Sequence, residues 1–282
     1  MELKFSHTFE ENRRLNLGWK PIIFVYLAYI LIMSLVVPTT SKVFGWGDLP
    51  SVLLAYSISA IVCLSLIFKL GRTPVSLGLA QEGFLKKWLV GWTFAILSLG
   101  FVFLTNILFS GLSFVYNKQF APLLFLLLLI GFAVQSFMEE FLLRALIQNQ
   151  ITMKFGVLIG ILGNALIFAI GHATNPGATI LSIVNTFLLG VAFSLMYYYH
   201  DNLWLVAGFH ASWNFILGPV LGIAVSGFDL PTTLLKTSLN MNKVYLNGGQ
   251  YGFEASYPVA LVSVIIILIY VSLLRKRESK VV

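Results

Sequence analysis

The chain has 282 residues, of which 58% are hydrophobic and 10% are charged, and its mean hydropathy is +0.89. These values exclude an ordinary soluble globular domain. The net charge of +7 indicates contact with a lipid bilayer rather than with nucleic acid. The basic residues gather at the ends of apolar segments, where they set orientation and meet anionic headgroups.

Eight apolar segments follow one another along the chain, most of them near the ~20 residues that a helix needs to cross a bilayer core of roughly 30 Å. They are apolar on every face, which favours helices over the alternating strands of a membrane barrel. The sequence therefore predicts an all-α, polytopic transmembrane helix bundle of about eight spans. The expected segments are Pro21–Val37, Ser51–Phe68, Trp88–Leu108, Pro122–Ile147, Val157–Gly171, Ile180–Tyr199, Leu203–Val225 and Pro258–Leu274.

The domain organisation is simple, because no separate soluble region and no convincing internal repeat interrupts the apolar segments. We expect one transmembrane domain over residues 21–274, with a motif-bearing core at 122–214. An N-terminal tail, 1–20, precedes it, and a basic C-terminal tail, 275–282, follows it.

The Lys and Arg residues fall unevenly on the predicted connections. Clusters occupy the N-terminal tail, the second-to-third connection and the C-terminal tail, and Lys154 follows the fourth segment. The alternate connections hold only Lys42, Lys118, Lys236 and Lys243. Because cytoplasmic loops carry the excess of basic residues, both termini of this integral membrane protein are predicted to be cytoplasmic.

A few ionisable residues lie inside the apolar segments instead of between them. Glu139, Glu140 and Arg144 are in the fourth segment, His172 ends the fifth, and His210 is in the seventh. A charge at mid-bilayer costs at least ~2.5–3.5 kcal/mol, so such residues are functional candidates.

The spacing of these residues divides them into two kinds. Glu140 and Arg144 are four apart on one helix face, where they can neutralise each other. Glu139 is rotated by about 100° from Glu140 and can therefore point into the bundle. His210 and Asn214 are again four apart, which sets an amide donor one turn from an imidazole.

Each of these features alone has a structural interpretation, as a hydrogen bond between helices or as a buried ion pair. Together, a carboxylate, two imidazoles and an amide form a set that can activate water and stabilise an oxyanion. The same carboxylate and imidazoles, Glu139, His172 and His210, could instead hold a divalent metal such as zinc. The residue types leave both chemistries open.

Three short motifs carry a resemblance to a known family. Glu139–Arg144 reads E-E-x-x-x-R, Phe168–His172 reads F-x-x-x-H, and His210–Asn214 reads H-x-x-x-N. In this order they resemble the motifs of the CPBP family (Abi, type 2 CAAX protease-like) of membrane peptidases. The resemblance covers roughly Pro122 to Asn214.

The resemblance implies a role for each motif residue. Glu139 would be the general base on water, assisted or metal-partnered by His172 and His210. Asn214 would help to hold the oxyanion, and the Glu140–Arg144 pair would support the site. The implied mechanism is that of a metalloprotease with a divalent ion such as zinc, or of a metal-free glutamate peptidase.

The implied function is that of an intramembrane endopeptidase acting on a membrane-associated peptide or protein. By resemblance, it would lie in a bacterial cell membrane, and its roles would be peptide maturation, export or self-immunity to bacteriocins. The expected partners are that substrate and the lipid bilayer, without nucleic acid. A catalytically silent scaffold or sensor, which would use the polar cluster for packing, is the main alternative. A proton-coupled transporter with Glu139 at its centre is the other.

The depth of the candidate residues imposes a condition on the fold. At ~1.5 Å per residue, His172 lies about 27 Å beyond Lys154, whereas Glu139 lies at most ~22 Å before it. His210 is only about two turns into its own helix. The three can meet only if the fifth helix is tilted or broken or begins well inside the cytoplasm. A bend is possible at Gly156, Gly160 and Gly163.

Overall fold

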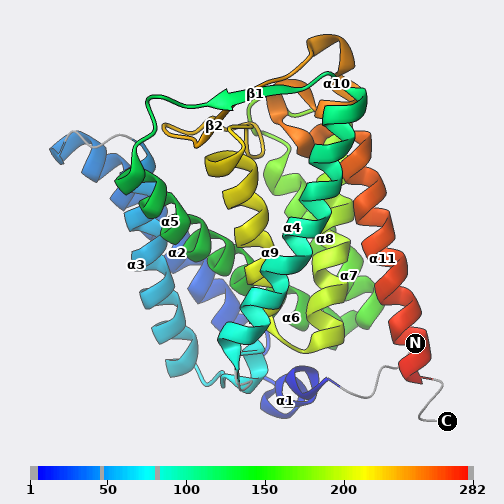
Figure 1. The fold of residues 1–282 in the computed structure, drawn as a ribbon. Coiled ribbons are helices and arrows are strands. Elements are labelled where there is room, and N and C mark those ends of the chain that lie inside the picture. The colour runs from blue at the N-terminus through cyan, green and yellow to red at the C-terminus, as the bar shows by residue number, and fades with distance from the viewer. Residues whose placement is uncertain (1–5, 45–47, 80–82, 279–282) are drawn as a thin grey trace.

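The computed structural model describes residues 6–44, 48–79 and 83–278, and it is almost entirely helical (Figure 1). A two-stranded antiparallel sheet at one end is formed by β1 (Ser113–Tyr116) and β2 (Leu235–Ser238), with Ser113 paired to Ser238. The α-helices are α1 (His7–Leu15), α2 (Lys20–Phe44), α3 (Asp48–Lys69), α4 (Phe84–Phe109), α5 (Pro122–Glu140), α6 (Asn149–Phe155), α7 (Val157–His172), α8 (Ile180–His200), α9 (Leu203–Phe215), α10 (Val244–Asn247) and α11 (Tyr257–Glu278).

The predicted all-α membrane bundle is confirmed, with a correction to the number of spans. All eight apolar segments form helices, but seven helices of the described residues are long and apolar enough to cross a membrane. The exception is α7, whose 16 residues extend about 24 Å at ~1.5 Å per residue. It is short because it begins after a turn at Gly156 and ends at the polar residues described below.

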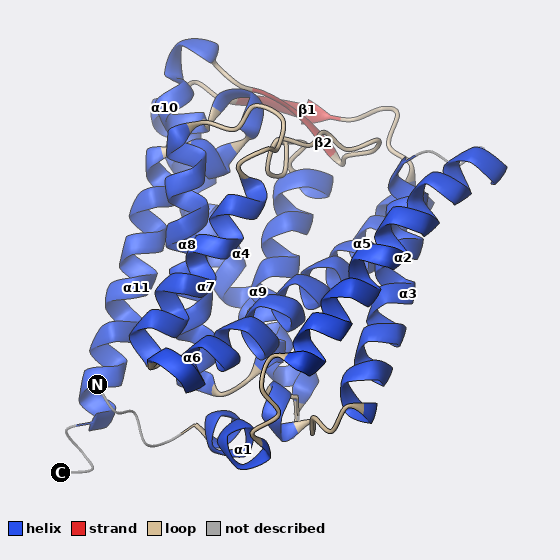
Figure 2. Cartoon of the chain, turned by 180° about the vertical axis from the view of Figure 1, so that it is seen from behind, coloured by secondary structure: helices blue, strands red, loops and turns tan. Residues whose placement is uncertain are grey.

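The two ends of the bundle differ in character (Figures 1 and 2). At one end lie α1, the turn from α6 to α7 and the end of α11; we call this the basic end. The strands β1 and β2 lie at the other, which we call the sheet end. The first long helix therefore starts, and the last one finishes, at the same end of the bundle.

The N-terminal tail is attached to the basic end through side chains. Helix α1 is capped by Ser6, whose hydroxyl also donates to Asp201 in the α8–α9 turn at 2.6 Å. Asn12 of α1 donates to the carbonyl of Ser76 at 2.6 Å. These buried bonds connect residues far apart in the chain, so α1 is part of the folded domain.

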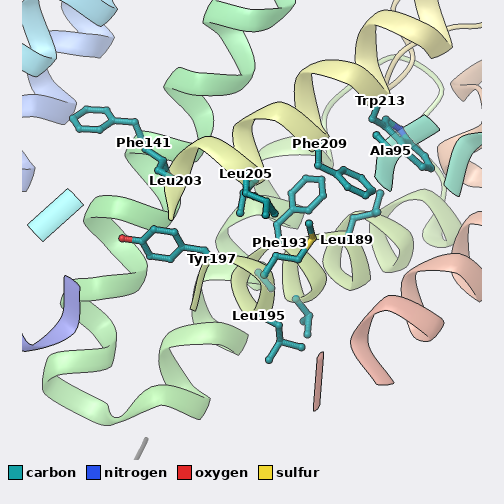
Figure 3. Packing of buried hydrophobic residues seen from close by; sticks show 14 of the residues in the cluster. Ala95, Phe141, Leu189, Phe193, Leu195, Tyr197, Leu203, Leu205, Phe209 and Trp213 are labelled. Carbon is teal, nitrogen blue, oxygen red and sulfur yellow. The ribbon is translucent and has the colours of Figure 1, made fainter. Parts of the chain in front are cut away.

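Helix α9 forms the centre of the bundle. Of the span Leu203–Val220, 83% is buried inside the protein, against 11% of Lys20–Val43 at the periphery. Figure 3 shows Phe193 of α8 against Phe209 of α9, and their ring centroids are 5.3 Å apart. The candidate residues on α9 are therefore presented to the interior of the protein and not to lipid.

Close backbone contact joins α4 to α9. A Cβ atom at Gly91 would overlap the carbonyl oxygen of Leu205, and one at Gly208 would overlap that of Trp88. Small residues at helix crossings in membranes allow this approach. The two glycines thus set the position of the central helix.

The α4–α9 contact predicts the effect of a single methyl group. Gly91→Ala must separate two backbones, and overpacking of this kind costs about 1–3 kcal/mol. We expect a lower midpoint of thermal unfolding in detergent than for the unchanged protein. Gly100→Ala on the same helix is the control, because its added Cβ would meet no atom within 4 Å. Equal midpoints for the two variants would contradict the contact.

Candidate active site

The first motif lies where the helix changes its winding. The sequence predicted a continuous helix to Ile147, but α5 ends at Glu140 and a π-helix follows over Phe141–Gln148. This wider turn is rare and is found frequently at functional sites. The π-helix contains Arg144 and leads directly into α6, toward the basic end.

A buried ion pair holds the centre of the site. Arg144 Nη1 lies 3.1 Å from Glu140 Oε1, and both side chains have no exposed surface. The guanidinium carbon is 4.7 Å from the ring centroid of Phe168 and 5.3 Å from that of Phe193. Such cation–π contacts gain strength when desolvated. They explain the phenylalanine of the second motif, to which the sequence assigned no task.

The same carboxylate orients the imidazole of His210. Its Nδ1 lies 2.8 Å from Glu140 Oε1, and an ionised carboxylate can only accept, so Nδ1 carries the proton. The other nitrogen, Nε2, then points toward Glu139, whose Oε2 is 3.9 Å away. The ion pair thus fixes which imidazole nitrogen meets the second carboxylate.

Glu139 is the accessible carboxylate of the pair, with 20% of its side chain exposed against none for Glu140. Its Oε1 accepts a hydrogen bond from Gln135, and Tyr56 approaches the same oxygen at 3.5 Å. Its Oε2 is itself buried and makes no hydrogen bond to any residue that the structure describes. The prediction that Glu139 points inward while its neighbour braces the helix agrees with this arrangement.

Gln135 is a site residue that the sequence analysis missed. Its amide nitrogen donates to Glu139, and its oxygen accepts from Asn214 Nδ2 at 3.2 Å. One side chain therefore bridges the Glu139 carboxylate and the amide of the third motif. A signal was available, since Gln135 is a polar residue in an apolar segment, four positions before Glu139 on the same helix face.

A cavity of about 580 Å³ brings the predicted residues together. Side chains of α3, α5, α9, the end of α7 and the loop 225–231 form its wall. The lining residues are Val52, Leu53, Tyr56, Leu128, Gly131, Phe132, Gln135, Glu139, Gly171, His172, Asn175, His210, Asn214, Val225, Ser226, Phe228, Asp229, Leu230 and Pro231.

His172 reaches this cavity because the chain breaks at Gly156, which adopts a positive φ of 87° between α6 and α7. Glu139 lies 17 residues before that glycine and His172 lies 16 after it, so a hairpin returns them to a similar depth. The fifth helix itself is not broken: α7 is continuous over Val157–His172, with Gly160 and Gly163 inside it, and the turn at Gly156 precedes it. His172 Nδ1 is bonded to the Phe168 carbonyl at 2.9 Å, and the Phe168 ring contacts both imidazoles, with centroids 4.5 and 6.2 Å away.

The side chains do not converge on one metal position as they are placed. Among the described residues, no three His, Cys, Asp or Glu side chains come close enough together to hold a metal ion. Glu139 Oε2 and His210 Nε2 lie 3.9 Å apart. His172 uses only Nδ1, at the Phe168 carbonyl, which leaves its Nε2 free among the described residues, as in metal-bound histidines. The Glu139–His210 pair also suits the activation of water.

Residues 121–216 match the family model described as type II CAAX prenyl endopeptidase Rce1-like. This segment is Rce1-like. It contains all three motifs, the ion pair and Gln135, and the family resemblance stated from the motifs is confirmed. The matched model describes a family of CAAX-type proteases. Seven long apolar helices among the described residues indicate an integral membrane protein. A comparison with curated proteins finds no match.

A second buried carboxylate, that of Glu254, holds loop 225–231 of the cavity wall in the Rce1-like site. Glu254 accepts from Trp213 Nε1 at 3.2 Å and from the backbone and hydroxyl of Ser226 at 2.5 and 2.9 Å. Trp213 belongs to the third motif, and Ser226 lies in the cavity wall with a positive φ of 48°. Burial raises the pKa of the neighbouring Tyr251 to about 12, which keeps this phenol neutral. Hydrogen bonds through Glu254 thus connect this loop to α9.

The ion pair predicts a difference in stability between the two adjacent glutamates. Glu140→Gln and Arg144→Ala each leave a buried charge without its partner, a cost of about 3–5 kcal/mol. We expect both variants to be depleted from the membrane fraction. Glu139→Gln is the matched control, because this side chain is partly exposed and has no ion pair with Arg144. Equal loss of all three variants would assign Glu139 to packing.

The bridge predicts that Gln135→Leu slows turnover without unfolding the protein. Loss of the amide frees Glu139 and Asn214 from their relative positions, and misplacement of this order costs up to about 10²-fold in rate. We expect kcat to fall while KM changes little, in a peptide-cleavage assay. Ser136→Ala is the control. The Ser136 hydroxyl donates a hydrogen bond to Gln135 Oε1, so its loss leaves both bonds of the bridge in place. A raised KM with an unchanged kcat would instead mean that Gln135 only forms part of the cavity wall.

Proposed function

We propose that the chain is an intramembrane endopeptidase that hydrolyses a peptide bond in a membrane-associated peptide or protein. The observation that carries this proposal is the placement of Glu139 Oε2 3.9 Å from His210 Nε2, at the wall of a cavity that Asn214 and His172 also line. The CAAX-type protease family of residues 121–216 supports it.

In the proposed reaction, Glu139 acts as the general base. A water molecule between Glu139 Oε2 and His210 Nε2 gives its proton to the carboxylate, while the oxygen attacks the scissile carbonyl carbon. Glu139 then passes the proton to the leaving amine nitrogen as the C–N bond breaks. The products are a carboxylic acid and an amine, so all atoms of the water are accounted for.

Asn214 serves the negative charge that develops on the carbonyl oxygen, while the imidazoles position the water and the substrate. One N–H of Asn214 is held by Gln135, which leaves the second for the oxyanion. His210 cannot turn away, because Glu140 holds its Nδ1. His172, at the other side of Phe168, is placed to contact the substrate or the water.

The cavity wall describes the proposed substrate. Most of the lining is apolar, and among the described residues its acidic members are Glu139 and Asp229, without any Lys or Arg. An apolar segment with neutral or basic neighbours therefore suits it better than one ending in a free carboxylate. Maturation or export of a secreted peptide, or protection against a bacteriocin, would supply such a segment.

The proposal predicts the effect of four substitutions on a folded enzyme. Glu139→Gln keeps the size of the side chain but removes the base, and turnover should fall by roughly 10²–10⁴-fold. Asn214→Ala should cost about 10²–10³-fold, the scale of one oxyanion donor. His172→Ala and His210→Ala should be comparable to Glu139→Gln. Cleavage of a quenched peptide library by purified protein is the measurement.

The control for this series is Ile130→Ala, on the lipid-facing side of α5, which should retain turnover. Dialysis against a strong chelator should leave the activity intact under the carboxylate mechanism. Loss of activity that Zn²⁺ restores would instead make Glu139 and His210 metal ligands. A biological readout that survives all four substitutions would show that the polar cluster serves a scaffold or sensor.

A further inference from the structure

The cavity approaches only one end of the bundle. Its wall includes Val52 and Leu53, near the start of α3, and the loop 225–231. Asp229 and Leu230 of this loop also line a smaller hollow with Lys236 of β2. These contacts place the rim of the cavity at the sheet end (Figure 2).

The wall is closed on the side of α3. The side chain of Leu53 packs directly on Gly131 of α5, so closely that a Cβ on the glycine would overlap it. By contrast, Phe228 has 53% of its surface exposed, and Asp229 and Pro231 are exposed as well. The loop 228–231 is therefore the accessible margin of the cavity.

The charges of the described residues distinguish the two ends. The sheet end carries Lys42, Lys118, Lys236 and Lys243 in its connections. The basic end carries more than twice as many, and the cytoplasmic side of a membrane protein holds the excess of Lys and Arg. These basic-end residues are Arg13, Arg14, Lys20, Lys69, Arg72, Lys86, Lys87, Lys154, Arg275, Lys276 and Arg277.

None of the described residues in the basic-end connections lines the cavity. On the cytoplasmic side of Glu139 lie the ion pair, the π-helix and α6, in which Arg144, Leu146 and Gln148 are buried. A substrate coming from the cytoplasm would have to pass through this packed layer, whereas one coming from the other side meets the loop 228–231.

We propose that the active-site cavity opens away from the cytoplasm, and that the substrate is an apolar peptide segment presented at the outer side of the membrane. That the segment is cleaved rests on the proposed function; the direction of access does not. The chain would then process peptides after their export or on their arrival from outside, rather than cytoplasmic proteins at their C-termini.

Cysteine accessibility tests the direction of access without any need for a substrate. The single native Cys63 is buried and is replaced by Ser. Phe132→Cys and Val52→Cys then report on the cavity from two helices, Asp229→Cys reports on its rim, and Lys154→Cys reports on the basic end. The probe is a charged, membrane-impermeant methanethiosulfonate, applied to right-side-out and inside-out vesicles.

We expect the cavity and rim cysteines to react in right-side-out vesicles, and Lys154→Cys to react only in inside-out vesicles. Ile130→Cys, two residues from Phe132 but 61% exposed on the outer surface of α5, is the matched control. A thiol facing lipid is poorly ionised, and each unit of raised pKa lowers the thiolate population tenfold, so Ile130→Cys should react at least about tenfold more slowly than Phe132→Cys.

Reaction of Phe132→Cys and Val52→Cys only in inside-out vesicles, together with Lys154→Cys, would overturn the proposal. Equal rates for Phe132→Cys and Ile130→Cys would also overturn it, since the cavity would then not be open to water. The same series with Glu139→Gln should give an unchanged labelling pattern. If labelling follows the expectation but no peptide is cleaved, the outward access stands and the peptidase function fails.

Discussion

The site depends on one buried charge being neutralised by a neighbouring carboxylate. Arg144 lies without exposed surface between Glu140 and the rings of Phe168 and Phe193. A charge in this position is tolerated only when its neighbours are fixed, because an unpaired guanidinium in the interior costs several kcal/mol. Phe168 of α7 and Phe193 of α8 must therefore stay close to Arg144, just after the end of α5. Through the second bond of Glu140 to His210 the ion pair also holds α9, so four helices share one constraint.

This constraint separates the tasks of two adjacent carboxylates. Glu140 is fully buried and neutralised by Arg144, and it acts on the chemistry only by orienting an imidazole. Glu139 faces the cavity and has one oxygen without a hydrogen bond to the described residues. Different environments for neighbouring carboxyl groups are a general route to different roles. Here the change from α-helix to π-helix directly after Glu140 accompanies the division.

The polar site can exist in an apolar bundle because its remaining surfaces are closed. The packed π-helix and α6 lie on the basic side of it, and Glu254 connects the loop at the sheet end to Trp213 of the central helix. Glu254 also shows how a carboxylate outside the motif core supports the site, because its bonds bridge residues 28 and 41 positions away. The proposed access to Glu139 from one direction needs no polar path through the whole bilayer.

The sequence by itself determined the features that depend on local composition. Runs of apolar residues are sufficient to locate membrane helices, and the high cost of a charge in lipid marks Glu139, Glu140, Arg144 and His210 as exceptions. The four-residue spacing of Glu140 and Arg144 was enough to predict their ion pair. Only the tertiary structure decided the features that depend on distant contacts. The bridge from Gln135 to Asn214 joins residues 79 positions apart, and the shortness of α7 follows from the turn at Gly156. The direction of the cavity depends on loop 225–231 folding over one end, and no local pattern of residues encodes which end that is.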